Sequence, residues 1–344
     1  MDTVKVMPAR ERQISPIGLL DRDYRALPRL FRRKRLLIIG CGDVGQRIAA
    51  LARPHWRVFG VARTAATRAL IRAAGALPLP ADARRRRLQD LADWVVHSAP
   101  PPAGEPPGGG PAIDRLTRAW TAKLLQAPGQ APRRSRAGPG GRASRPLPAK
   151  RLVYLSTTGV YGDRQGRLTS EVSPVQPLTD RARRRADAER WLRLAGRRSR
   201  QLRVTILRVP GIYAIDRLPL QRLRDRLPAL SPCDDVQTNH IHAGDLARLA
   251  RTALLRGRAQ RILNVADDSD LPMGEYLDLV ARWAGLEPPP RVDRQTLLAT
   301  VSAVRASFMA ESRRLANRRM KRELGLALRY PTVAEFLAAH QPPG

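Results

Sequence analysis

One stretch, RLLIIGCGDVGQRIAALA at residues 35–52, indicates how this chain folds. Its first five residues are mostly large and apolar, which is typical of a buried parallel strand. Three glycines follow in the spacing Gly40-x-Gly42-x-x-Gly45. Residues 44–52 then have the apolar spacing of a helix, which Pro54 ends. A strand, a glycine turn and a helix in this order predict the start of a doubly wound α/β fold.

Short apolar runs keep alternating with helical segments after this unit. We expect strands at residues 56–61, 77–79, 94–97, 151–156 and 202–207, and helices at 65–74, 113–126 and 179–195. This alternation is typical of a Rossmann doubly wound parallel sheet. From about residue 210 the pattern loosens, with one further strand expected at 261–265. The looser part predicts a smaller C-terminal α/β lobe packed against the end of the sheet.

The composition divides the chain into three parts. We expect an N-terminal tail over residues 1–33, an NAD(P)-binding Rossmann domain over 34–209 and a smaller substrate lobe over 210–344, partly interleaved with the Rossmann domain. Residues 127–149 are rich in Pro, Gly and Arg and contain no acidic residue. Such a composition buries too little apolar surface to fold by itself, so we interpret this segment as a mobile surface insertion.

The net charge of +33 suggests nucleic-acid binding at first sight. Only five of the 63 basic residues are lysines, however, and the arginines are spread along the chain instead of forming a patch. We therefore expect no specific nucleic-acid partner. No apolar run is long enough to cross a membrane, and Cys41 and Cys233 show neither disulfide nor metal-ligand spacing. These features predict a cytoplasmic chain without a metal site.

The glycine loop has the features that a dinucleotide phosphate needs. Gly40 permits the tight turn, Gly42 lets the pyrophosphate approach the backbone, and Gly45 lets the helix pack closely on the strand. The start of the helix, at Asp43 and Val44, adds free N–H groups and a partial positive charge. We therefore expect this loop to bind a dinucleotide.

The end of the second strand indicates which dinucleotide is bound. A carboxylate at this point would favour NAD by binding the ribose, but the sequence continues with Arg63 and Thr64. A guanidinium group makes bidentate contacts to a phosphate, and a hydroxyl adds a further hydrogen bond. We therefore expect NADP in preference to NAD, with a chance placement of Arg63 as the alternative.

Later motifs, taken with the glycine loop, resemble those of the extended and atypical short-chain dehydrogenase/reductase superfamily. Within it, the chain resembles bacterial NAD(P)-dependent epimerase/dehydratase-like proteins. The motifs are LSTTGVYG at 155–162, LRVPGIY at 207–213, NHIH at 239–242, NVADD at 264–268 and the tail from Asn317 to Pro331. The resemblance implies an NAD(P)-dependent oxidoreductase or epimerase/dehydratase-like enzyme that acts on a carbonyl, alcohol or sugar-nucleotide substrate.

The resemblance also implies roles for particular residues. Active members of the superfamily use a Ser or Thr, a Tyr and a Lys. Thr157 occupies the Ser/Thr position, where it would polarise a substrate oxygen, and Ser156 lies beside it at the cofactor. The Tyr and Lys positions fall on Arg181 and Arg185. Arg185 keeps the ability to bind ribose or phosphate, whereas the guanidinium of Arg181 does not replace a phenol.

The missing phenol leaves three interpretations open. Another group supplies the proton, with Tyr161 as the nearest candidate and Tyr213 as the second, although the tyrosine of this turn is usually structural in the family. Alternatively, the chemistry needs no phenol. In the third interpretation the chain is a non-catalytic NADP-binding redox sensor or regulator. The sequence predicts neither the substrate nor the oligomeric state.

Other residues have a structural interpretation beside a functional one. Asp114 fits a helix-start carboxylate, with the position of the family's catalytic Asn as the alternative. His240 and His242 lack a third metal ligand and precede a helix that Asp245 would cap. Cys41 fits a small packing residue, with a pKa lowered by the helix N-terminus as the alternative.

Overall fold

The computed structural model describes residues 33–81, 91–102, 112–125, 149–199, 201–301, 306 and 309–342. The part of the chain from Lys34 onward forms one compact unit. The tail predicted over residues 1–33 and the insertion predicted over 127–149 lie outside the described residues, except for their last residues. Within the described ranges, no helix is both long enough and apolar enough to span a membrane.

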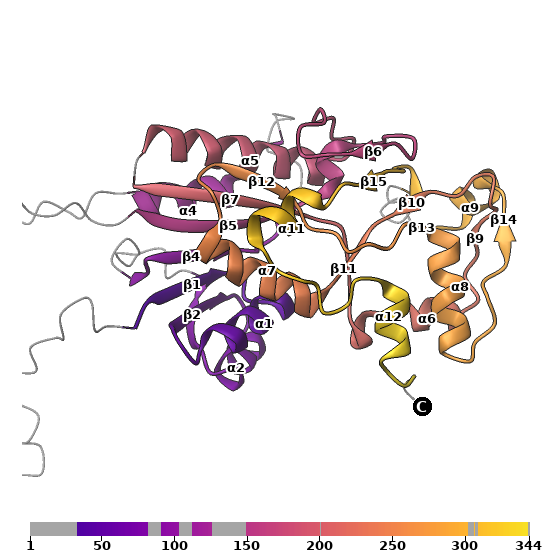
Figure 1. Ribbon diagram of the computed structural model, residues 1–344, viewed down its shortest axis with the longest axis horizontal. Coiled ribbons are helices and arrows are strands. Elements are labelled where there is room, and N and C mark those ends of the chain that lie inside the picture. The colour runs from indigo at the N-terminus through magenta and orange to yellow at the C-terminus, as the bar shows by residue number, and fades with distance from the viewer. Residues whose placement is uncertain are drawn as a thin grey trace, which may run out of the picture. The chain divides into compact units, whose positions relative to one another are not determined.

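A seven-stranded parallel sheet forms the centre of the fold (Figure 1). In chain order its strands are β1 (Arg35–Ile39), β2 (Arg57–Ala62), β3 (Leu77–Pro80), β4 (Trp94–His97), β5 (Lys150–Thr157), β7 (Leu202–Val209) and β12 (Arg261–Asn264). Their order across the sheet is β12-β7-β5-β4-β1-β2-β3. The chain changes direction between β1 and β4, which is the switch point where doubly wound folds bind ligands. The predicted Rossmann fold is confirmed.

Helices cover both faces of this sheet. One face carries α1 (Asp43–Ala52), α2 (Ala65–Ala73), α7 (Ala243–Arg256) and α11 (Arg318–Leu324), and the other carries α4 (Arg115–Leu125) and α5 (Asp180–Arg198). Along β1, the side chains of Leu36 and Ile38 pack on the face that α1 and α7 cover, and those of Leu37 and Ile39 pack on the face that α4 and α5 cover. Because successive side chains of a strand point to opposite faces, a strand covered on both sides must be apolar throughout.

The C-terminal lobe consists of short helices and two-stranded pairs. Its helical elements are η4 (Ile215–Arg217), α6 (Leu220–Arg224), α8 (Met273–Trp283), α9 (Arg294–Thr300) and α12 (Val333–Ala338). The strand pairs are β8 (Gly211–Tyr213) with β11 (His240–His242), β9 (Ala229–Leu230) with β14 (Arg291–Val292), β10 (Gln237–Thr238) with β13 (Leu271–Pro272), and β6 (Leu168–Thr169) with β15 (Arg314–Leu315). Tyr213, Tyr276 and Phe336 belong to the separate core of this lobe.

The strand predicted at 261–265 lies in the central sheet, whereas we expected it in the C-terminal lobe. It is not part of the C-terminal lobe but forms β12, the edge strand of the central sheet, parallel to β7. Ile262 joins one core of the sheet and Leu263 the other, so both faces of this short strand are covered. The Rossmann domain and the C-terminal part of the chain are therefore extensively interleaved. The strand β12 belongs to the Rossmann sheet, and α7 and α11 cover one face of that sheet.

A buried polar network joins β5, β7, α5 and β12. The side chains of Arg208 and Glu189 are 2% and 5% exposed, and their Nη2 and Oε2 atoms are 2.7 Å apart. Ser156 Oγ donates to Glu189 Oε1 at 2.6 Å. The guanidinium of Arg208 lies 4.5 Å from the centre of the Tyr161 ring, and Tyr161 Oη donates to Asn264 Oδ1 at 2.7 Å. The ion pair joins β7 to α5, and the contacts of Ser156 and Tyr161 extend the network to β5 and β12.

We expect Arg208→Ala to lower the free energy of unfolding by about 3–5 kcal/mol, because the substitution leaves the Glu189 carboxylate buried without its partner. Urea denaturation measures this loss. The matched control is Arg282→Ala on the exposed end of α8, with an expected change within about 0.5 kcal/mol. The double variant Glu189→Leu, Arg208→Leu should recover part of the loss because no charge stays unpaired. A loss below about 1 kcal/mol for Arg208→Ala would contradict a structural role for the pair.

Candidate functional site

The glycine loop joins β1 to α1 at the carboxyl edge of the sheet. Gly40 has a φ of +83°, and a Cβ atom at this position would lie 2.4 Å from Ala99 Cα. A Cβ atom at Gly45 would lie 3.2 Å from Gly40 O, whereas one at Gly42 would have no neighbour within 4 Å. The loop therefore requires glycine at positions 40 and 45 for its conformation and packing. At Gly42, the absence of a side chain leaves the outer side of the loop open.

Neighbouring strands hold the loop in place. Cys41 N donates to Val61 O at 3.0 Å, and Ser98 Oγ donates to Gly40 O at 2.8 Å. The first-turn N–H groups of α1 have no acceptor within the helix, and its N-cap, Gly42, has no side chain to supply one. An anion at this helix start would therefore receive hydrogen bonds and a favourable dipole. Sequence reasoning missed Ser98, because its contact depends on a strand distant in sequence.

We expect Gly40→Ala to lower the free energy of unfolding by about 2 kcal/mol or more, because an alanine is strained at positive φ and its methyl group would overlap Ala99. Gly42→Ala should change it by less than about 0.5 kcal/mol, since this position has normal φ and open space. Thermal and urea unfolding of the two variants give the comparison. Equal effects of the two substitutions would show that the loop does not have this geometry.

Asp43, the first residue of α1, takes part in an exposed cluster of four charges. Its carboxylate pairs with Arg47 at 2.8 Å and with Arg217 at 3.0 Å, and Arg47 also lies 3.3 Å from Asp216. Asp216 and Arg217 belong to η4, so the cluster links the start of α1 to the C-terminal lobe. The sequence predicted Asp43 as a cofactor-binding residue at the helix start, and it did not predict these partners.

Arg63 and Thr64 follow β2, beside the loop. Thr64 Oγ1 accepts a hydrogen bond from Thr67 N at 3.2 Å and so caps α2. The Arg63 side chain is exposed, and its backbone oxygen accepts from Arg68 Nη1 at 3.0 Å. The end of β2 therefore presents a guanidinium group to solvent and no carboxylate.

Cys41 lies beneath the loop and is 1% exposed. Its Sγ atom would be 3.0 Å from a Cβ atom at Gly60 on β2, so the thiol fills the space between strand and loop. Burial raises the pKa of the Cys41 thiol to about 12. The alternative of a pKa lowered by the helix N-terminus is therefore wrong, and the packing interpretation agrees with the structure.

We expect iodoacetamide at mildly alkaline pH to modify Cys233, which is exposed, and to modify Cys41 roughly 100-fold more slowly, because only the thiolate reacts. Mass spectrometry of the folded protein distinguishes the two sites. Both cysteines should react in guanidinium chloride. Rapid modification of Cys41 in the folded protein would mean that the loop opens in solution.

A cavity of about 210 Å³ lies beside the end of β5. Its wall includes Thr157, Arg181, Gln237, His240, Glu311 and Arg313. Thr157 is the last residue of β5, and β4 alone separates β5 from β1. Ile39 at the end of β1 is level with Tyr154 on β5, two strands away, and Thr157 lies three residues farther along, so the two strand ends are about 14 Å apart at the carboxyl edge of the sheet. The cavity and the glycine loop therefore occupy one edge.

Two of the residues that we predicted from the resemblance line this cavity. Thr157 Oγ1 accepts a hydrogen bond from Gly159 N at 3.3 Å, which leaves its hydroxyl hydrogen available for another acceptor. Arg181 lines the same cavity at the position of the missing tyrosine. Arg185, one turn later, donates to Leu155 O at 2.8 Å and to Tyr154 Oη at 3.0 Å, so it is held against β5.

Two other predicted residues face away from the cavity. Ser156 is 5% exposed and donates to Glu189, and Tyr161 is fully buried and donates to Asn264. Burial also raises the pKa of Tyr161. The structure thus places Ser156 and Tyr161 in the buried network and outside the cavity wall, while their assignment to the cofactor and to catalysis stays a prediction. Tyr213 is 1% exposed, and burial raises its pKa as well.

Sequence reasoning missed Glu311 and Arg313 in the cavity wall, and it interpreted His240 as a structural residue. Arg313 Nη1 donates to Glu311 Oε2 at 2.8 Å and to Gly162 O at 2.7 Å, with side-chain exposures of 11% and 8% for Arg313 and Glu311. His240 is 6% exposed and stacks on Tyr276 at 4.2 Å between ring centres. Residues 311–313 carry no motif and lie far from Thr157 in the sequence, so no local signal could have identified them.

The remaining candidates have structural roles. Asp114 is fully buried and accepts from Thr117 N at 2.9 Å at the start of α4. His242 Nδ1 accepts from Gly244 N at 3.2 Å and caps α7, whereas Asp245, which we expected as the cap, accepts from Tyr330 N at 3.0 Å. Among the residues that the structure describes, no group of three or more potential ligands could hold a metal ion.

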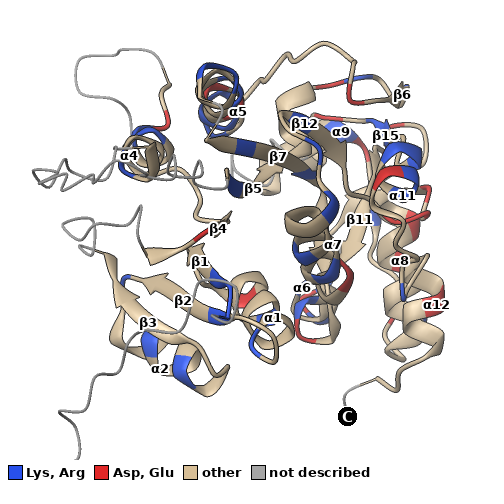
Figure 2. Cartoon of the chain, turned by 60° about the vertical axis from the view of Figure 1, so that its left-hand side comes forward, with Lys and Arg blue, Asp and Glu red and all other residues tan. Residues whose placement is uncertain are grey.

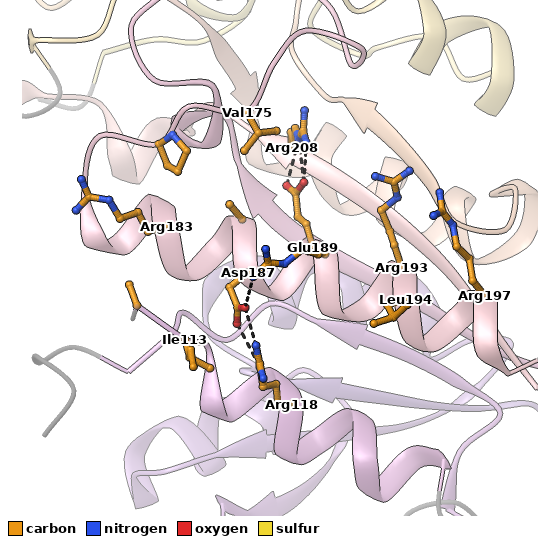
Figure 3. Close-up of a pocket in the computed structure, with 14 residues that line it drawn as sticks. Ile113, Arg118, Val175, Arg183, Asp187, Glu189, Arg193, Leu194, Arg197 and Arg208 are labelled. Carbon is orange, nitrogen blue, oxygen red and sulfur yellow. Dashed lines mark hydrogen bonds and ion pairs between the residues drawn. The ribbon is translucent and has the colours of Figure 1, made fainter. Parts of the chain in front are cut away.

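A larger cavity of about 900 Å³ lies between α4 and α5 (Figure 3). Within it Arg118 pairs with Asp187 at 2.7 Å, and the Arg208–Glu189 pair lies in its wall. Figure 2 marks the Lys and Arg positions along α5 in blue. Neither the glycine loop nor Thr157 lines this cavity, so we place the candidate site at the smaller cavity beside β5.

The fold and site define a Rossmann protein whose dinucleotide-type loop and polar cavity share one edge of the sheet. Residues 142–266 match the model of the NAD dependent epimerase/dehydratase family. This match includes Thr157 and Arg181 but not the glycine loop. The predicted resemblance to epimerase/dehydratase-like proteins is thereby confirmed.

Individual proteins resemble this chain in sequence or in fold. Protein YeeZ of Escherichia coli K12 is 28% identical over 139 residues, which is 40% of this chain and 48% of YeeZ, so the alignment spans about half of that relative. A conserved protein of unknown function from Silicibacter pomeroyi DSS is 28% identical with a TM-score of 0.71, covering 89% of this chain and 97% of its own. A UDP-glucuronic acid 4-epimerase from Bacillus cereus, solved with NAD, is 14% identical with a TM-score of 0.63, covering 89% and 96%. The last shows similarity of fold alone.

Proposed function

We propose that the chain is an NADP-dependent enzyme of the epimerase/dehydratase-like type that acts on a carbonyl or alcohol group held in the cavity beside Thr157. The observation that supports this most directly is the shared edge of the sheet: the Gly40–Gly45 loop follows β1 at the switch point, and Thr157 ends β5 next to β4. A ligand that reaches from the loop to the cavity would cross the place where doubly wound folds bind dinucleotides.

The residues of the loop fit a dinucleotide. Gly42 leaves its outer side open, and the first turn of α1 offers N–H groups to the pyrophosphate. Arg63 beside the loop would pair with a 2′-phosphate, which supports NADP over NAD. The similar Bacillus cereus epimerase was solved in complex with NAD, which supports a nicotinamide dinucleotide in general.

The cavity residues would orient and polarise the substrate. A bound nicotinamide dinucleotide supplies or accepts the hydride. The Thr157 hydroxyl would donate to the substrate oxygen, and the fixed positive charge of Arg181 would stabilise negative charge on that oxygen without transferring a proton.

A non-catalytic NADP-binding regulator is the second candidate. Two observations favour it: Arg181 lines the cavity where the tyrosine is expected, and Tyr161 is fully buried. A screen of carbonyl compounds for oxidation of bound NADPH, followed by absorbance, separates the two functions. Turnover with any of them would support the enzyme.

Calorimetric titration with NADPH and NADH tests the cofactor. We expect the wild type to bind NADPH more tightly than NADH, and Gly42→Asp to abolish binding because a carboxylate would repel the pyrophosphate. Arg63→Ala should weaken NADPH binding about ten-fold or more while leaving NADH unchanged, since a charged hydrogen bond to phosphate contributes about 1.5–3 kcal/mol.

The control for Arg63 is Arg72→Ala, which removes an exposed arginine from the last turn of α2. If Arg63→Ala weakens both nucleotides equally, the preference for NADP has another origin. If the wild type binds neither nucleotide, both the enzyme and the regulator are excluded.

A further inference from the structure

We infer that Arg217 of the C-terminal lobe is a positioning residue of the dinucleotide site: it holds and neutralises the carboxylate of Asp43, which would otherwise repel the pyrophosphate at the glycine loop. The lobe thereby contributes to the affinity for the dinucleotide. This inference rests on the proposed function, because it concerns the same loop.

Asp43 places a negative charge beside the group that the loop would bind. It is the first residue of α1 and directly follows Gly42, so its own N–H is one of the free donors of the first helical turn. Its side chain is 41% exposed and is therefore accessible to a ligand. A carboxylate at a helix N-terminus is favourable when no other anion is present, but it repels a pyrophosphate that binds the same N–H groups. Without compensation, Asp43 would weaken dinucleotide binding.

Two arginines compensate this carboxylate. Arg47 Nε donates to Asp43 Oδ1 at 2.8 Å from the next turn of the same helix, and Arg217 Nη1 donates to Asp43 Oδ2 at 3.0 Å from η4. Each oxygen of the carboxylate thus has its own guanidinium partner. Arg47 also lies 3.3 Å from Asp216, so the cluster contains two positive and two negative charges. Its charges sum to zero only while Arg217 is present.

The core of the C-terminal lobe holds the backbone of Arg217. Its N–H donates to Ala214 O at 2.9 Å, and the residues on either side of η4, Ala214 and Leu218, are buried. Leu218 belongs to the same core cluster as Tyr213. Buried residues therefore anchor η4 at both ends, and the lobe determines from where Arg217 reaches Asp43.

The exposure of the four side chains sets the kind and size of the effect. They are between 33% and 60% exposed, so water screens the charges and the pairs stabilise the fold little. One uncompensated charge about 6 Å from a bound phosphate changes the binding constant about three-fold in a water-like medium, and more where the ligand displaces water. Removal of Arg217 should therefore alter ligand binding and leave stability almost unchanged.

Calorimetric titration of Arg217→Ala with NADPH and NADH tests this inference. We expect both nucleotides to bind about three- to ten-fold more weakly than to the wild type, because the pyrophosphate is common to them. Arg63→Ala, in contrast, should weaken NADPH binding alone. Asp43→Asn should tighten the binding of both nucleotides. The double variant Asp43→Asn, Arg217→Ala should bind within about two-fold of the wild type, since the remaining charges of the cluster again sum to zero.

Three controls separate charge compensation from a general defect. Arg217→Lys keeps the charge and should retain most of the affinity. Arg282→Ala removes one positive charge from the exposed end of α8 and should change the binding of neither nucleotide. The thermal midpoint of Arg217→Ala should lie within about 2 °C of the wild type. Raising the salt concentration from about 50 mM to about 500 mM should reduce the difference between Arg217→Ala and the wild type, because salt screens exposed charges.

Two results would overturn the inference. The first is equal affinity of the wild type and Arg217→Ala for both nucleotides. The second is a double variant that binds as weakly as Arg217→Ala, because the loss would then come from a missing link between η4 and α1 or from a missing contact with the ligand, and not from the charge of Asp43.

Titration with inorganic pyrophosphate separates this inference from the proposed function. If pyrophosphate binds with the expected responses to Arg217→Ala and Asp43→Asn while neither nucleotide binds, the role of Arg217 stands and the proposed function fails. If the nucleotides bind and Arg217→Ala has no effect, the proposed function stands and the role of Arg217 is wrong. If neither the nucleotides nor pyrophosphate bind, both fail.

Discussion

The buried pair of Arg208 and Glu189 sets the constraint on which the site depends. Two charges without access to water are tolerated only when they satisfy each other, so β7 and α5 must stay at a fixed distance and register. Ser156 donates to the same carboxylate and adds the end of β5 to this constraint. Thr157 is the last residue of β5, and Arg181 lies in the first turn of α5. The Arg208–Glu189 pair therefore determines how these two cavity residues lie relative to each other.

The sequence predicted the sheet well, because parallel strands covered on both faces require continuous apolar runs and the helices between them require a different spacing. It predicted the glycine loop for a similar reason: Gly40 adopts a backbone conformation that other residues avoid. It misplaced the strand at 261–265, since an apolar run shows that a strand is buried but does not show which sheet buries it.

The direction of neighbouring side chains explains why the site was only partly predictable. Ser156 and Thr157 are consecutive on β5, and consecutive side chains point to opposite faces of a strand. One hydroxyl therefore joins the buried network and the other reaches the cavity. Family motifs specify that both are present but not which one faces the ligand. Glu311 and Arg313 were inaccessible to sequence reasoning because their contacts with Gly162 and with each other depend on the path of the C-terminal lobe.

The late position of α7, β12 and α11 in the chain has a consequence for biosynthesis. During translation, the first six strands of the sheet leave the ribosome before the helices that cover the centre of one face and before the strand that pairs with β7. The nascent chain therefore exposes the edge of β7 until β12 (Arg261–Asn264) is synthesised, and it exposes part of an apolar face until α11 (Arg318–Leu324) is synthesised. Exposed surfaces of this kind are bound by chaperones and promote aggregation, so the efficiency of folding in the cell should depend on the speed of translation through the C-terminal lobe.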